Sequence, residues 1–144
     1  MKFFADASFL YNAYCPDQAF AAIARRLRNQ FSIKVSVAVI LEFKLGALWN
    51  DKYKHGWEEL KKDMEKGSVK EVAVEWDRLF SEFMPAVLQF GKKSQPRLID
   101  GLHVLAARQI GATHFISFDH RSRQRAFARA TGLKVLPERL LGEF

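Results

Sequence analysis

Short apolar runs alternate along the chain with segments whose apolar residues recur every three or four positions. Apolar runs at 2–5, 113–118 and 133–136 predict buried strands, and helical spacing appears at 17–30, 74–90, 97–110 and 121–131. Gly111 and Gly132 are placed to end the last two helices, and Pro85 is expected to kink or split the helix at 74–90. Strands separated by helices predict an α/β domain of three layers, with helices on both faces of a mostly parallel sheet of about five strands.

Two other segments differ in their expected burial. The stretch 35–49 is apolar at almost every position, which predicts a buried element, whereas 58–66 is charged at nearly every step and should lie at the surface. The segment 91–96 combines Gly, Lys, Ser and Pro and is typical of a loop. No repeat or linker divides the chain, so we expect residues 1–144 to form one domain.

Composition narrows the class of protein. A chain of 144 residues with 49% hydrophobic and 27% charged residues is expected to be ordered. Its net charge of +7 favours a polyanionic partner such as nucleic acid. The single cysteine, Cys15, excludes an internal disulfide and a cysteine-rich metal site. The N-terminus lacks the apolar stretch of a signal peptide and no run is long enough to span a membrane, so we expect a cytoplasmic protein.

The most informative feature is the position of four acidic residues in apolar surroundings. Glu42 is the only charged residue between 35 and 43, and Asp100 is the only acid between 98 and 107. Asp6 and Asp119 each follow directly on a predicted strand. Burying an unpaired carboxylate costs several kcal/mol, so these acids require a cation, hydrogen bonds or protonation.

Parallel strands end at one edge of their sheet, and we therefore expect Asp6 and Asp119 to meet there, joined by Glu42 and Asp100 from helices. Carboxylate oxygens alone favour Mg²⁺ or Mn²⁺ over zinc. Such ions polarise a phosphoryl oxygen and lower the pKa of bound water, as hydrolysis of a phosphodiester requires. A basic protein with such an acidic metal pocket is suited to cutting a phosphodiester.

At these residues the sequence resembles the PIN-domain ribonucleases, especially the VapC toxins of bacterial VapBC toxin–antitoxin pairs. The matching segments are residues 4–8, 36–42, 99–107 and 111–119, together with 132–137 near the end of the chain. In sequence they depart from the family at Val39, where threonine is common, and at Arg121, where some members carry a further acid. Those departures concern the number and affinity of the metal ions and leave the four acids intact.

The resemblance implies a PIN-like α/β fold and a function. Asp6, Glu42, Asp100 and Asp119 would coordinate Mg²⁺ or Mn²⁺ for cleavage of RNA, and the hydroxyls of Ser8 and Ser117 would hydrogen-bond at the site. It also implies a homodimer and an antitoxin protein that blocks the acidic pocket. Neither the RNA sequence that is cut nor the cleavage site can be predicted from these motifs.

These residues could also have purely structural roles. Asp6 and Asp119 could cap helices, Asp100 could interact with a helix dipole, and His103 could be either a hydrogen-bond partner at the site or a core residue. Arg121, Arg125 and Arg129 recur every four residues on one helical face, which could grip RNA phosphates or simply be solvated.

Two other functions also remain open. A phosphatase or phosphoacceptor domain would place an acid after the first strand, although it usually needs a second acid where Ser8 stands. A catalytically inactive RNA- or protein-binding module would retain the fold and bind without turnover.

Overall fold

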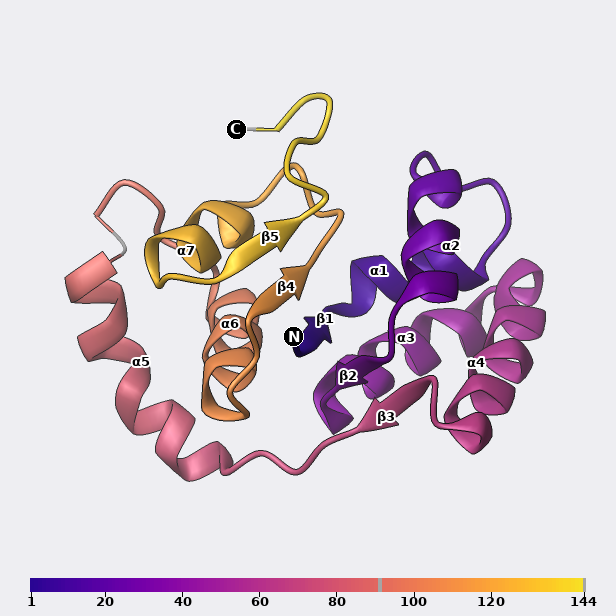
Figure 1. Cartoon of the computed structure of the whole chain (residues 1–144), viewed down its shortest axis with the longest axis horizontal. Coiled ribbons are helices and arrows are strands. Elements are labelled where there is room, and N and C mark those ends of the chain that lie inside the picture. The colour runs from indigo at the N-terminus through magenta and orange to yellow at the C-terminus, as the bar shows by residue number, and fades with distance from the viewer. Residues whose placement is uncertain (91, 144) are drawn as a thin grey trace.

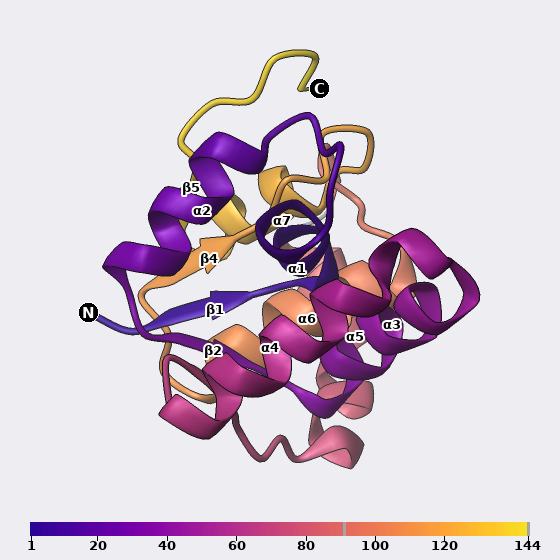
Figure 2. The same ribbon diagram turned by 90° about the vertical axis from the view of Figure 1, so that its right-hand side faces the viewer.

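The computed structural model describes residues 1–90 and 92–143, and its centre is a five-stranded sheet (Figure 1). All neighbouring strands pair in parallel, in the spatial order β3-β2-β1-β4-β5. The strands are β1 (Phe3–Ala5), β2 (Ile33–Val35), β3 (Val69–Glu71), β4 (His114–Ile116) and β5 (Lys134–Leu136). Figure 2 shows β4, β1 and β2 in succession. The predicted parallel α/β fold is thus confirmed.

Seven α-helices and one short 3₁₀ helix connect the strands in the described part of the chain. The helices are α1 (Ala7–Tyr14), α2 (Ala21–Gln30), α3 (Val37–Trp49), α4 (Lys54–Lys66), α5 (Trp76–Phe90), α6 (Leu98–Gln109) and α7 (Gln124–Ala130), with the 3₁₀ helix η1 at Asp51–Tyr53. In Figure 1, α1 to α4 gather around the β2–β3 half of the sheet and α5 to α7 around the β4–β5 half. None of the described helices is both long and apolar enough to cross a membrane.

The core forms where the strands meet the inner faces of these helices. Phe4, Ile33 and Phe115 on three neighbouring strands are fully buried, and Phe9 on α1 and Phe43 on α3 are fully buried as well. Rings of Phe4 and Phe115 stack with centroids 6.2 Å apart on the paired strands β1 and β4. This apolar centre fixes the strand ends at which the acidic residues lie.

Several predicted elements differ in their limits. The helix expected at 17–30 is only α2, and a separate helix, α1, precedes it directly after β1. Pro85 does not split its helix, because α5 runs unbroken through it. Helices α6 and α7 end just before Gly111 and Gly132, as predicted, and both glycines adopt positive φ. Of the loop expected at 91–96, residue 91 lies outside the described residues.

The prediction that 35–49 is buried throughout is wrong for one face of α3. Val39, Ile40, Phe43 and Ala47 face the core, while Leu41, Leu45, Leu48 and Trp49 are more than half exposed. A second apolar stripe is exposed on α5, where it consists of Phe80, Met84 and Leu88. Apolar residues all round a helix predict burial, but the chain by itself covers only one side of α3.

Candidate active site

The order of the strands creates a crevice between β1 and β4. From β1 the chain moves outward to β2 and β3, and it then returns to the other side of β1 to form β4 and β5. Open parallel sheets bind ligands at the carboxyl edge where the strand order reverses in this way. Asp6 directly follows β1, and Asp119 lies three residues beyond β4, so both acids come from segments that leave the sheet at this point.

A pocket of about 290 Å³ opens at this edge, and all four predicted acids line it. Its lining residues are Asp6, Ala7, Ser8, Tyr11, Glu42, Asp100, His103, Phe118, Asp119, His120 and Arg121. They come from the ends of β1 and β4 and from helices α1, α3 and α6. Segments up to 115 residues apart in sequence therefore contribute to one acidic pocket.

Asp6 is the most enclosed of the four acids. Its Oδ1 accepts hydrogen bonds from the Ser8 hydroxyl at 2.5 Å and from the backbone N–H of Phe9 at 3.2 Å, and its Oδ2 accepts from the Ser117 hydroxyl at 2.6 Å. The bond to Phe9 makes Asp6 the N-cap of α1 as well as a pocket residue. Burial raises the pKa of Asp6 above its usual value even though both hydroxyls favour the ionised form.

Ser8 and Ser117 join Asp6 to the segment that follows β4. The Ser8 hydroxyl accepts from the backbone N–H of Phe118 at 2.8 Å, and that of Ser117 accepts from the N–H of Asp119 at 3.2 Å. The two hydroxyls therefore connect the side chain of Asp6 to the backbone of the segment that follows β4. They hold the carboxylate of Asp6 in register with the backbone that carries Asp119.

Asp100 lies in the first turn of α6 and faces the other acids. Partial burial and the negative charges of Asp119, Asp6 and Glu42 raise its pKa to about 6. Asp119 is held differently, since its Oδ1 accepts from the backbone N–H groups of Arg121 and Ser122 at 3.2 and 3.1 Å. It closes a local turn and does not cap α7, which begins at Gln124.

Glu42 on α3 is paired with His103 on α6. The distance from His103 Nε2 to Glu42 Oε1 is 2.6 Å, and the histidine side chain is 2% exposed while that of Glu42 is 42% exposed. Nδ1 of His103 is buried without a hydrogen-bond partner in the described part of the chain. Because an unpaired buried N–H is costly, the geometry favours the tautomer that carries its proton on Nε2 and donates it to Glu42.

From the sequence, His103 could be either a site residue or a core residue. In the structure it is buried and is hydrogen-bonded to Glu42. Tyr11 and His120 also line the pocket, and neither was predicted. Tyr11 donates a hydrogen bond to the backbone carbonyl of Glu42 at 3.2 Å. Gly46 leaves room for it, since a Cβ there would lie 1.7 Å from the Tyr11 hydroxyl. Only the short helix α1, absent from our prediction, places Tyr11 there.

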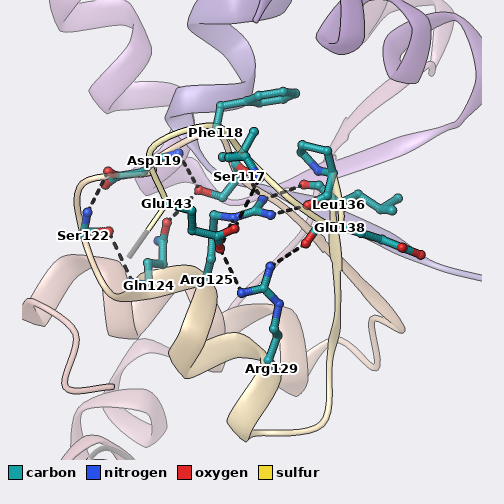
Figure 3. A network of polar contacts seen from close by, with 12 residues as sticks. Ser117, Phe118, Asp119, Ser122, Gln124, Arg125, Arg129, Leu136, Glu138 and Glu143 are labelled. Carbon is teal, nitrogen blue, oxygen red and sulfur yellow. Dashed lines mark hydrogen bonds and ion pairs between the residues drawn. The ribbon is translucent and has the colours of Figure 1, made fainter. Parts of the chain in front are cut away.

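The predicted row of three arginines is wrong. Arg121 precedes α7 and lines the acidic pocket, whereas Arg125 is 1% exposed and points inward. Arg125 donates hydrogen bonds to the carbonyls of Ser117, Leu136 and Pro137 and forms an ion pair with Glu143 (Figure 3). Arg129 shares Glu143 with it at 2.8 Å. Arg125 is therefore a structural residue that cannot contact RNA phosphates.

The donor set fits a hard divalent cation, because four carboxylates line one pocket without cysteine. In this arrangement, however, no three Asp, Glu, His or Cys side chains of the described residues are grouped closely enough to hold an ion. Like charges repel, and hydrogen bonds to Ser117 and His103 fix the present positions of Asp6 and Glu42. Binding a cation here requires the carboxylates to draw inward, and the positive charge of the ion would offset the repulsion that this movement increases.

Solved structures with the same architecture come from several organisms. VapC20 of Mycobacterium tuberculosis, described as a toxin that cleaves the sarcin–ricin loop, superposes with a TM-score of 0.67 at 16% identity, over 94% of this chain and 100% of that one. VapBC2 of Rickettsia felis, bound to a DNA fragment from its promoter, gives a TM-score of 0.64 at 16% identity, over 94% and 97% of the two chains. FitAcB of Neisseria gonorrhoeae gives 0.64 at 13% identity, over the same shares.

No protein-family model and no curated protein sequence matches the chain. The likeness to solved structures concerns the fold, and it covers nearly the full length of each chain. It agrees with the resemblance that the four acidic motifs indicate in the sequence. The chain has the PIN-like α/β fold of the VapC toxins.

Proposed function

We propose that the protein is a ribonuclease dependent on Mg²⁺ or Mn²⁺ and the toxin of a toxin–antitoxin pair. The observation that carries the proposal is the acidic pocket itself: Asp6, Glu42, Asp100 and Asp119 line one cavity at the edge where parallel sheets bind ligands. VapC20, which has the same fold, is a toxin that cleaves an RNA loop, and this supports the assignment.

Different residues of the chain have different roles in the proposed site. A bound Mg²⁺ or Mn²⁺ would polarise the scissile phosphate and make a neighbouring water more acidic. Ser8 and Ser117 fix the orientation of Asp6, and His103 fixes that of Glu42. Arg121, on the rim of the pocket, is placed to attract the negatively charged RNA backbone.

The direct test is cleavage of RNA by the purified protein with Mg²⁺ or Mn²⁺, with EDTA, and with the ion restored after EDTA. We expect cleavage only when a divalent ion is present. A small phosphate ester assayed in parallel separates the alternatives. Turnover of the ester without RNA cleavage would point to a phosphatase, and RNA binding without any product to an inactive binding module.

The pair formed by His103 and Glu42 gives a second prediction. Replacing His103 by leucine removes the hydrogen bond to Glu42, and we expect Mn²⁺ affinity to fall about tenfold to a hundredfold, as for other residues that orient metal ligands. His103→Gln can place an amide donor near the position of Nε2 and should retain most of the affinity. Calorimetric titration of Mn²⁺ measures the effect independently of cleavage. Equal losses in both variants would indicate that His103 only fills the core.

Two exposed apolar stripes support the partners that the family resemblance implies. Leu41, Leu45 and Leu48 on α3 remain uncovered in the single chain, as do Met84 and Leu88 on α5. Large apolar side chains in rows are typical of protein interfaces. We propose that a second copy of the chain covers them in a homodimer, and that an antitoxin protein binds over the acidic pocket. VapBC2 of R. felis supports the latter as a toxin–antitoxin complex of the same fold.

A further inference from the structure

A second hollow, of about 610 Å³, lies beside the acidic pocket. Its lining residues are Phe83, Gln95, Pro96, Arg97, Leu98 and Arg123, and we call it the arginine pocket. Two segments contribute to both pockets. The first turn of α6 supplies Leu98 to one and Asp100 to the other, and the loop before α7 supplies Arg123 and Arg121 respectively. These two segments therefore form a rim between the two pockets.

This rim is strongly basic. Its two loops carry Lys92, Lys93, Arg97, Arg121 and Arg123, and no acid occurs at 92–99 or 120–130. Among the described residues, no ion pair neutralises Arg97 or Arg123, and Arg123 donates only a long hydrogen bond of 3.4 Å to the Lys93 carbonyl. Both side chains are exposed. Two guanidinium groups are thus free to bind an anion close to the start of α6, the helix that carries Asp100.

The floor of the arginine pocket is apolar and rigidly attached to the acidic site. Phe83 and Pro96 pack directly onto the backbone of Gly101, where an added Cβ would lie 2.7 Å from the phenylalanine ring and 2.9 Å from the proline ring. Gly101 follows Asp100 on the same helical turn. An aromatic ring and two guanidinium groups are the combination that binds single-stranded nucleic acid, by stacking on a base and contacting its phosphates.

We infer that the arginine pocket is a subsite for single-stranded RNA, which binds the nucleotide next to the scissile phosphate. Arg97 and Arg123 contact the phosphate of this nucleotide, and Phe83 contacts its base. The inference rests on the proposed ribonuclease function. It predicts that RNA lies across both pockets. The cleaved bond lies at the four acids, and the neighbouring nucleotide binds in the arginine pocket at the start of α6.

The test compares two double variants that lose the same charge. Arg97→Gln combined with Arg123→Gln removes the guanidinium groups of the pocket. Arg25→Gln combined with Arg26→Gln removes two exposed arginines from α2, which lies across the molecule from the α5–α6 loop in Figure 1. With an RNA that spans both pockets, the pocket variant should raise KM about tenfold or more with kcat nearly unchanged, and the control should change KM less than about threefold. Phe83→Leu should raise KM about fivefold without changing the salt dependence.

Binding of fluorescein-labelled RNA to the same proteins, in EDTA, separates this inference from the function it rests on. If the wild-type protein binds RNA but cleaves none, the ribonuclease proposal fails, and the subsite is still tested by the dissociation constants. A weaker affinity of the pocket variant than of the control supports the subsite. Equal affinities of the two double variants would overturn it, because net charge alone would then explain the binding.

Discussion

Asp100→Asn should lower RNA cleavage by about a hundredfold or more, because it removes a charged oxygen ligand from the centre of the acidic pocket. Asp100 faces Asp119, Asp6 and Glu42, whose negative charges all raise its pKa. The matched control is Asp77→Asn on the exposed first turn of α5, which should leave cleavage unchanged. Initial rates at saturating Mg²⁺ measure both. Full activity of the purified Asp100→Asn protein would remove this residue from the site.

The same substitution should make the metal-free fold more stable at neutral pH. The pKa of Asp100 is raised from 3.8 to about 6, so the folded protein disfavours its ionised form. The resulting penalty is fully present above about pH 6 and disappears as the pH falls through 6 towards 3.8. Since the carboxyl is partly exposed, we expect a gain of only about 1–2 kcal/mol for Asp100→Asn near pH 7.5.

Thermal unfolding in EDTA, at neutral and at acidic pH, measures this difference. The advantage of Asp100→Asn over wild type should shrink at the lower pH, whereas Asp77→Asn should follow wild type throughout. A variant less stable than wild type at neutral pH would show that Asp100 supports the fold. Loss of activity would then be uninformative about metal binding.

The parts of this site that could be predicted are those that leave a local pattern in the sequence. Asp6, Glu42, Asp100 and Asp119 stand out because a lone acid in an apolar segment is costly to bury without a purpose. Their common pocket follows from the topology, since the ends of parallel strands meet at one edge. The contact between His103 and Glu42 could not be predicted, because it depends on how the chain places α6 relative to α3.

Other failures have local causes. Strands β2 and β3 were missed because neither forms an apolar run: β2 reads Ile-Lys-Val and β3 reads Val-Lys-Glu. Helix α1 was missed because its residues are apolar on most sides and so give no clear helical period; Phe9, Leu10 and Ala13 are all buried. The exposure of one side of α3 was not predicted, because apolar residues all round a helix do not indicate which of them the chain itself covers. In each case the missing information concerns packing between elements.

The predicted row of three arginines was wrong for a related reason, and one of the three gives the prediction with the largest expected effect on stability. A spacing of four places Arg121, Arg125 and Arg129 on one helical face but does not say whether that face meets solvent. Arg125 in fact joins the ends of β4 and β5, with its Nη1 2.5 Å from the Ser117 carbonyl and 3.3 Å from the Leu136 carbonyl (Figure 3). It also ties down the C-terminal segment through Glu143 at 2.9 Å.

Arg125→Leu should therefore destabilise the protein by about 3–5 kcal/mol, because it leaves buried carbonyls without their donor and removes one of the two arginines that pair with Glu143. Burial would raise the pKa of Glu143, but hydrogen bonds from Arg129 and Arg125 bring it down to about 2, so Arg125→Leu removes one of the two groups that stabilise the charged acid. Arg129→Leu is the control: its side chain is 40% exposed, and its loss should cost less than about 1 kcal/mol. Urea unfolding measures both variants. Equal midpoints would mean that Arg125 is dispensable, and that the packing of the strands alone holds the backbone of Ser117 against the acidic pocket.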